Sequence, residues 1–267
     1  MTEFDLQLGD CVAGMARLAA ASIDLVVTSP PYNLGIRYGK FADTADRESY
    51  LDWCEEWAAQ IRRLLQPNGS LFLNLGATPS NPMLPHEVVL RLRKIFVLQN
   101  TIHWIKSIAL PNEFGPGEIS RGHFKPINSP RYLNDCHEYV FHFTPEGKTP
   151  LDRLALGVPY QHKSNIARWT HTAGQDRRCR GNTWFVPYET IQRRDKERPH
   201  PATFPVQLAE NCILLHGLTR AKRMLDPFLG IGNSAVAAKR CSLTCFLGFE
   251  IDENYLEEAR RRIATVR

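Results

Sequence analysis

The sequence predicts an α/β fold with a doubly wound, mostly parallel sheet. Segments typical of strands alternate with segments typical of helices along most of the 267 residues, a pattern that places helices on both faces of a parallel sheet. Two of the expected strands run into turns rich in proline or glycine, at 28–33 and 226–233. Open α/β sheets bind their ligands at such strand ends. The length allows one large domain with an insertion, or two small domains.

The composition excludes several classes of protein. A content of 43% hydrophobic and 23% charged residues is typical of a soluble globular protein. The first ten residues lack the basic segment and apolar core of a signal peptide, and no run of about 18 apolar residues predicts a membrane span. The seven cysteines have irregular spacing without a C-x-x-C pair. They are expected to be reduced cytoplasmic thiols that form no metal site. A membrane partner is not expected either.

The first 106 residues carry strand and helix signals in alternation. Short apolar or β-branched runs predict the strands, and apolar residues at helical spacing predict the helices. Strands are expected at 4–8, 23–27, 70–75 and 96–105, and helices at 11–20, 47–65 and 86–94. A Pro-Asn-Gly turn at 67–69 is expected to end the second helix before its strand begins.

The turn after the second predicted strand contains Ser29, Pro30, Pro31 and Tyr32. Each proline fixes its own φ and favours an extended residue before it, so Ser29 and the carbonyl group of Pro30 are held stiffly. Together with the flat ring of Tyr32, these two acceptors suit a planar group that carries an amine. A simple strand-ending turn has a similar sequence, and the segment alone does not separate the two interpretations.

Residues 107–182 lack regular periodicity, apart from one strand expected at 137–143, and lie in the basic part of the chain. Residues 101–200 contain 15 Lys and Arg against 10 Asp and Glu, which accounts for the net charge of +5. A basic centre between neutral halves predicts a bound polyanion, although any single arginine here is also compatible with a solvated loop. Cations mixed with aromatic residues suit phosphate contacts and base stacking. The candidate cations are Arg121, Lys125, Lys163, Arg168, Arg177, Arg178 and Arg180.

The last third of the chain again alternates strands and helices. Strands are expected at 183–186, 223–226 and 244–249, and helices at 206–217, 233–240 and 253–263. Asp226, Pro227, Phe228, Gly230, Gly232 and Asn233 belong to a glycine-containing turn that opens a helix. In such a turn the backbone approaches a ligand closely, and the helix N-terminus favours a negative group.

Glu250 ends the strand that follows this turn, 20 residues after Gly230. An acid at that place typically accepts the two ribose hydroxyls of an adenosine-containing cofactor. A cap for the final helix is the alternative role, but Asp252 is equally suited to it. The two ligand-binding turns are expected to follow neighbouring strands of the sheet, because a permuted chain builds the same sheet when its ends lie close together.

The pairing of TSPPY with DPFLGIG, in this order, resembles the beta-class exocyclic-amino DNA methyltransferases over nearly the whole chain. The resemblance implies S-adenosylmethionine as cofactor, with the residues from Asp226 to Asn233 at its binding turn and Glu250 on its ribose. Asp10 resembles the aspartate that reaches the adenine, and Thr203 and Phe204 resemble a segment that encloses the methionine moiety. The family often has Ser and Thr where this chain has Ile231 and Asn233, and a Lys near Phe204.

The resemblance also implies a seven-stranded, circularly permuted Rossmann-like methyltransferase sheet with a loop-rich target-recognition insertion. Residues 1–106 would form the catalytic half, 107–182 the target-recognition region with strand 137–143 in the main sheet, and 183–267 the cofactor half. The implied partner is duplex DNA in a cytoplasmic, nucleoid-associated setting. A homodimer and a cognate restriction endonuclease are further implied partners that the sequence does not decide.

In this family a serine at the first position of the SPPY motif usually accompanies methylation of cytosine N4, and an aspartate that of adenine N6. Ser29 therefore predicts a cytosine-N4 methyltransferase that flips the base out of the duplex and stacks it on Tyr32. Adenine N6 is the first alternative. A DNA-binding module without turnover would not need the cofactor turn. An RNA or protein amide methyltransferase usually places that turn before the amine-binding turn, which here is Ser29–Tyr32 and is called the socket.

Overall fold

The computed structural model describes residues 2–33, 44–79, 81–111, 118–122, 129–133, 135–188 and 203–266. Its strands are β1 (Glu3–Leu8), β2 (Ile23–Thr28), β3 (Leu65–Leu75), β4 (Val97–Pro111), β5 (Glu118–Gly122), β6 (His137–Thr144), β7 (Thr183–Pro187), β8 (Arg223–Asp226) and β9 (Cys245–Glu250). Its helices are α1 (Cys11–Ala16), α2 (Arg47–Leu64), α3 (Leu84–Leu92), α4 (Ser164–Arg168), the 3₁₀ turn η1 (Thr170–Thr172), α5 (Val206–His216), α6 (Asn233–Arg240) and α7 (Glu253–Thr265).

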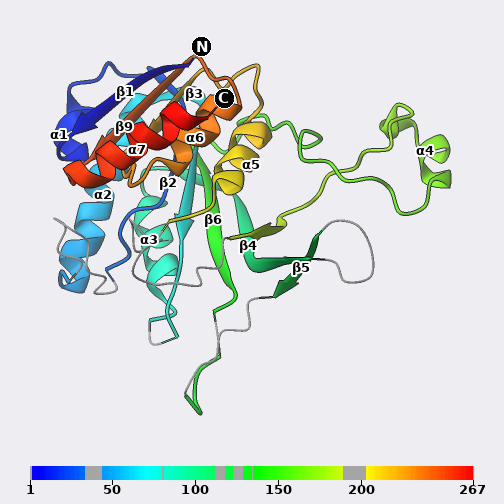
Figure 1. Cartoon of the computed structure of the whole chain (residues 1–267), viewed down its shortest axis with the longest axis horizontal. Helices are drawn as coiled ribbons and strands as arrows, with labels where there is room; N and C mark the ends of the chain where they lie inside the picture. Colours follow the sequence, from blue (N-terminus) through cyan, green and yellow to red (C-terminus); the bar gives the residue numbers. More distant parts are fainter. Residues whose placement is uncertain are drawn as a thin grey trace.

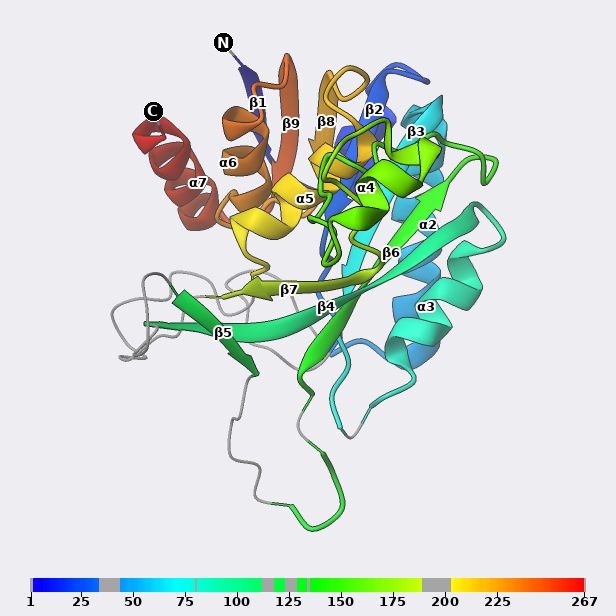
Figure 2. The same ribbon diagram turned by 90° about the vertical axis from the view of Figure 1, so that its right-hand side faces the viewer.

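The described strands form one sheet in the order β1-β9-β8-β2-β3-β6-β4-β5, with β7 paired to β4 (Figures 1 and 2; β7 and β8 are labelled in Figure 2). Strands β1, β9, β8, β2 and β3 are parallel, whereas β6 is antiparallel to both of its neighbours. The α/β class and the mostly parallel sheet are therefore confirmed. The predicted count of seven strands is wrong, because β5 and β7 extend the sheet to nine at the side of β4.

Helices cover both faces of the sheet, as Figure 2 shows with α5, α6 and α7 on one side and α2 and α3 on the other. Strand β2 shows why both faces are apolar. Leu25 and Val27 belong to the core under α5–α7, and Ile23 and Val26 to the core under α1–α3. A central parallel strand buried on both faces reads as a continuous apolar run, which is what the sequence of β2 shows.

Three boundaries differ from the predictions. Helix α1 ends at Ala16 rather than near residue 20. Strand β3 begins at Leu65, directly after α2, because the pairing with β2 jumps from Leu65 to Ser70 and the Pro-Asn-Gly segment forms an irregularity inside the strand. Strand β4 continues to Pro111 and pairs with β5, so regular structure extends beyond residue 107. The other predicted elements are present with small shifts of their ends.

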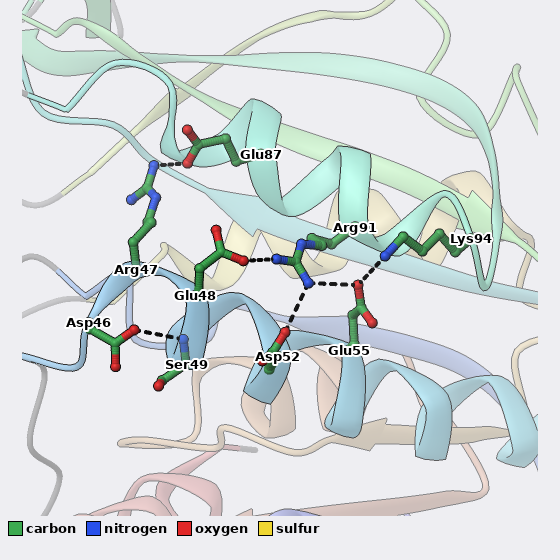
Figure 3. Close-up of polar contacts among 9 residues, drawn as sticks. All are labelled: Asp46, Arg47, Glu48, Ser49, Asp52, Glu55, Glu87, Arg91 and Lys94. Carbon is green, nitrogen blue, oxygen red and sulfur yellow. Dashed lines mark hydrogen bonds and ion pairs between the residues drawn. The ribbon is translucent and has the colours of Figure 1, made fainter.

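Two further features concern the outer layers. Ion pairs link α3 to α2, with Arg91 and Lys94 facing acids of α2 (Figure 3). The last helix, α7, packs on the first strand, β1, so the chain ends are close enough for the permuted order that the sequence suggests. Within the described residues, no helix combines the length and the apolar character that a bilayer crossing needs.

Candidate active site

The two predicted turns follow neighbouring strands. Strand β2 pairs in parallel with β8, with Leu25 opposite Met224 and Val26 opposite Leu225. The Thr28 hydroxyl donates to Oδ1 of Asp226 at 2.6 Å and so joins the two strand ends directly. The expected adjacency of the socket and the cofactor turn, at the point where α2 and α6 leave for opposite faces, is therefore confirmed.

Asp226 acts as the junction between these turns. Its carboxylate is buried and accepts hydrogen bonds from Thr28, from the backbone N–H of Phe228 at 3.0 Å and from the hydroxyl of Ser234 on α6. Burial raises the pKa of Asp226 to about 6, against the lowering effect of these bonds. The carboxylate thus holds the turn in shape and is directed at protein donors rather than at a ligand.

The glycines of the turn have different structural reasons. Gly230 and Gly232 both have positive φ, 53° and 79°, which other residues adopt rarely. A Cβ at Gly232 would also lie 2.8 Å from the Cβ of Ala259 on α7, so this glycine allows close helix packing. The backbone N–H of Gly230 donates to Oε2 of Glu250 at 2.8 Å. The turn is therefore tied to the end of β9.

Glu250 is oriented by two backbone groups. Its Oε2 accepts from Gly230, and its Oε1 accepts from the N–H of Asp252 at 2.9 Å. Burial raises the pKa of Glu250 above its ordinary value. Asp252 caps α7 through the N–H of Asn254, so the cap that was the alternative role of Glu250 is filled by Asp252. Each oxygen of Glu250 keeps a further lone pair for a hydroxyl donor.

The remaining predicted cofactor residues lie around the same strand ends. Asp10 follows β1, caps α1 by accepting from Ala13 at 2.8 Å, and is exposed. The preceding N–H, of Gly9, donates to the carbonyl of Glu250, which places Asp10 beside the end of β9. Thr203 is exposed, and Phe204 is buried and accepts from the amide of Asn233 at 2.5 Å.

One unsatisfied polar atom at this edge suits a bound ligand. The side-chain oxygen of Asn233 is buried without a hydrogen-bond partner among the described residues, and it lies at the N-terminus of α6, where a ligand donor would satisfy it. Phe228, in contrast, packs its ring 5.4 Å from Trp53 and 5.7 Å from Trp57 of α2. The two tryptophans therefore belong to the packing under the turn.

The socket residues form a connected polar group. The hydroxyls of Ser29 and Tyr32 lie 2.7 Å apart, and Tyr50 of α2 donates to the carbonyl of Pro31 at 2.8 Å. Pro30 is buried, whereas Ser29 and Tyr32 are half-buried. The turn is thus fixed to α2 through Tyr50. Its polar side chains stay at the edge where β2 ends.

Sequence reasoning missed three residues that complete this group. The Tyr32 hydroxyl is close to Asn74 of β3 and Glu138 of β6, and Glu138 is close to Lys106 of β4. Oε2 of Glu138 is 3.3 Å from the Tyr32 hydroxyl and accepts from Asn74 at 2.9 Å, and Oε1 pairs with Lys106 at 2.6 Å. The sequence offers one signal, a carboxylate near the start of the strand at 137–143, which otherwise contains aromatic residues, valine and histidines; it indicates a polar site at that strand end.

The predicted DNA-binding cations do not form one cluster. Lys125 lies outside the described residues, and Arg121 belongs to β5. The other five lie in the arm 150–182, which carries α4 and stands apart from β5 in both views (Figures 1 and 2). There Lys163 pairs with Asp176, and Arg177 and Arg180 donate to the carbonyls of Ala155 and Leu156. Arg168 and Arg178 are exposed.

Among the described residues, the seven cysteines form no disulfide bonds. Within the described ranges, no group of three or more His, Cys, Asp or Glu side chains is arranged to hold a metal ion.

Comparisons with known proteins agree with this geometry. The family model described as DNA methylase, N6_N4_Mtase, matches residues 23–261. The type II methyltransferase M.ScaI of Streptomyces caespitosus is 29% identical over 266 residues, which are 96% of this chain and 79% of that protein. The DNA adenine methyltransferase YhdJ of Escherichia coli K12 is 25% identical over 269 residues, 96% of this chain and 81% of that protein. TTHA0409 of Thermus thermophilus, solved with S-adenosyl-L-methionine, matches with a TM-score of 0.62 at 26% identity, covering 98% of this chain and 93% of that one.

Proposed function

The chain belongs to the N6_N4_Mtase family of S-adenosylmethionine-dependent DNA methylases that modify exocyclic amines, and we propose that its target is the N4 amine of cytosine in duplex DNA. The observation that carries this choice is Ser29. A neutral hydroxyl, rather than a carboxylate, stands at the end of β2 as the first acceptor of the socket. Adenine N6 is the alternative, because the same two acceptors fit either amine and the relative YhdJ is named a DNA adenine methyltransferase.

The socket would activate the amine by orientation. The lone pair of an exocyclic amine is delocalised into the base ring, which makes it a poor nucleophile. Ser29 Oγ and the Pro30 carbonyl would each accept a hydrogen bond from one N–H of the amine. These bonds would favour a more tetrahedral nitrogen, whose lone pair points at the methyl group. S-adenosylmethionine supplies that methyl group in activated form. The Thr28–Asp226 bond supports this role, because it ties the socket to the cofactor turn.

The cofactor would lie along the ends of β1, β9 and β8. We assign the ribose hydroxyls to Glu250, whose two oxygens are already oriented by Gly230 and Asp252. Asp10, beside the end of β9, would face the adenine. Thr203 and Phe204 would enclose the methionine moiety, and the unpartnered oxygen of Asn233 would accept from it.

DNA would reach the socket as an extruded base, because the amine is inaccessible inside a duplex. The half-buried ring of Tyr32 offers the stacking surface. We propose residues 107–182 as the target-recognition region, with the exposed Arg168 and Arg178 contacting phosphates. M.ScaI is named a type II methyltransferase, which supports a cognate restriction endonuclease as partner; a homodimer is a further proposal.

The choice between the two bases is tested by product analysis. Purified protein is incubated with unmethylated bacteriophage DNA and methyl-labelled S-adenosylmethionine, and the DNA is digested to nucleosides for mass spectrometry. The expected product is N4-methylcytosine. Label in N6-methyladenine would overturn the base assignment alone, and cofactor binding without label in either base would contradict DNA as the substrate.

A further inference from the structure

The hydrogen bonds around Tyr32 determine how the Ser29 hydroxyl points. The Tyr32 oxygen lies 2.7 Å from Ser29 Oγ, 3.2 Å from the carbonyl oxygen of Asn74 and 3.3 Å from Oε2 of Glu138. The carbonyl and the ionised carboxylate only accept hydrogen bonds. The single hydroxyl hydrogen of Tyr32 must therefore point at them, since otherwise oxygen lone pairs would face one another. It follows that Ser29 donates its hydrogen to Tyr32.

Glu138 is fixed in the position that this arrangement requires. Oε1 pairs with Lys106 at 2.6 Å, and Oε2 accepts from the Asn74 amide at 2.9 Å. The amide of Asn74 also donates to the carbonyl of Tyr139 at 3.0 Å, which fixes the amide itself. The side chains of Glu138 and Lys106 are 14% and 24% exposed, so water screens this ion pair less than an exposed one.

Gly76 allows the side chains of Tyr32 and Glu138 to approach each other closely. A Cβ at this position would lie 3.0 Å from the Tyr32 ring and 3.1 Å from the carboxyl group of Glu138. The backbone after β3 thus contacts both groups with no side chain between them. The series of polar contacts from Lys106 through Glu138 and Tyr32 to Ser29 is consequently continuous.

We propose that Glu138 is a positioning residue that holds the Ser29 hydroxyl as a hydrogen-bond acceptor for the target amine. The inference rests on the proposed role of Ser29 and applies equally to cytosine N4 and adenine N6. A serine hydroxyl rotates freely unless its hydrogen has a partner, and a free rotor can donate to the amine lone pair and block its attack. With its hydrogen committed to Tyr32, Ser29 presents only lone pairs to the amine.

The proposal differs in its consequences from a purely structural ion pair. A structural role would lower the stability of the fold or the affinity for the cofactor. A positioning role acts through the Tyr32 hydroxyl, so the carboxylate of Glu138 and the hydroxyl of Tyr32 should have coupled effects on one rate. A double-mutant cycle measures such coupling.

The experiment compares Glu138→Gln, Tyr32→Phe, their double variant and Ser29→Ala, with Glu146→Gln as a matched control. Glu146 is exposed and follows the end of β6. Single-turnover methyl transfer from tritiated S-adenosylmethionine to unmethylated bacteriophage DNA is measured with saturating cofactor, and calorimetry gives the cofactor dissociation constant. We expect Glu138→Gln and Tyr32→Phe each to slow transfer about 10-fold or more. The double variant should be no slower than the slower single variant, with cofactor affinity unchanged.

Three outcomes would overturn the proposal. Wild-type transfer by Glu138→Gln beside slow transfer by Ser29→Ala would remove Glu138 and leave the proposed function intact. Rate effects that multiply in the double variant would show that Glu138 does not act through Tyr32. Wild-type transfer by Ser29→Ala would refute the proposed role of Ser29 and the inference with it. If Glu138→Gln does not fold by circular dichroism, Tyr32→Phe alone decides, because a wild-type rate in that variant excludes the route through its hydroxyl.

Discussion

Two polar groups, each containing a serine, lie at the two ends of the strand pair β3 and β6, and they differ in burial. At the socket end, Asn74 and Glu138 support Ser29 through Tyr32. At the other end, the hydroxyl of Ser70 lies 2.9 Å from Nε2 of His142 and 2.9 Å from Nδ1 of His216. The socket group is half-open and contains an ion pair, whereas Ser70 and both histidines are buried.

The placement of hydrogens gives these groups opposite capacities. The Asn100 amide donates to Nδ1 of His142, so Nε2 of that ring carries the hydrogen and donates to Ser70. Ser70 then donates to Nδ1 of His216, and its hydroxyl is used on both sides. Ser29 donates in one direction only and keeps its lone pairs for a ligand. Both ends thus have a serine beside titratable groups, but of these two serines Ser29 keeps lone pairs, whereas Ser70 belongs to a satisfied core.

The largest expected effect comes from exchanging these serines for alanine. Ser29→Ala should slow methyl transfer on the order of 100-fold, because an oriented acceptor is lost at the reacting amine. Its free energy of unfolding should change by less than about 1 kcal/mol. Ser70→Ala should behave in the opposite way. It leaves two buried ring nitrogens without a partner, which costs about 2–3 kcal/mol, while transfer per folded molecule is unchanged.

Urea denaturation and single-turnover kinetics on both variants, with the exposed Ser164→Ala as control, check this pair. A stability loss in Ser29→Ala comparable to that of Ser70→Ala, or an equal rate loss in both, would remove the distinction between the two ends.

The second prediction concerns pH. Burial lowers the pKa of His142 from 6.5 to about 3 and that of His216 from 6.5 to about 4. Between these values and 6.5 the unfolded chain binds more protons than the folded chain, so both histidines make the protein less stable as the pH falls from 6.5 toward 4. Asp226 opposes them, because its folded pKa of about 6 lies above the ordinary 3.8; its contribution falls as the pH rises between those values.

His216→Gln removes one of the two histidine contributions. The slope of unfolding free energy against pH between about 4 and 6 should fall by about 1.4 kcal/mol per pH unit relative to wild type. Urea titrations at several pH values measure it, with the exposed His162→Gln as control. An unchanged slope in His216→Gln would show that this ring is not held neutral in the folded protein.

Local signals predicted most of the fold, and the contacts they failed to predict are long-range. The β2 and β8 turns were predictable because proline, glycine and apolar runs act within a few residues. Glu138 approaches Tyr32, and Lys106 approaches Glu138, because β6 inserts antiparallel between β3 and β4, an arrangement that no local pattern encodes. For the same reason, strand β5 was missed, and β7 was predicted as a strand without a place in the sheet. The candidate cations were predicted from composition alone, which does not say how α4 and β5 are placed relative to each other; their contact with DNA stays a prediction.

The smallest expected effect comes from a third polar group, whose acids lie at the surface and which has no hydroxyl to orient. On the outer face of α2 and α3, Arg91 pairs with Glu48, Asp52 and Glu55 (Figure 3). Surface ion pairs gain little because water screens them and side-chain entropy opposes them. Arg91→Met should lower Tm by about 2 °C or less at low salt and by less still in concentrated salt, where the charges are screened. Transfer should be unchanged.

Calorimetry at two salt concentrations checks this, with the exposed Arg93→Met as the matched control on the same helix end. A large, salt-independent loss of Tm would mean that the arginine acts through packing of its stem rather than through charge. The small expected effect gives the comparison its scale. An ion pair is expected to affect methyl transfer where, as proposed for Glu138, it is partly buried and connected through a hydroxyl to Ser29.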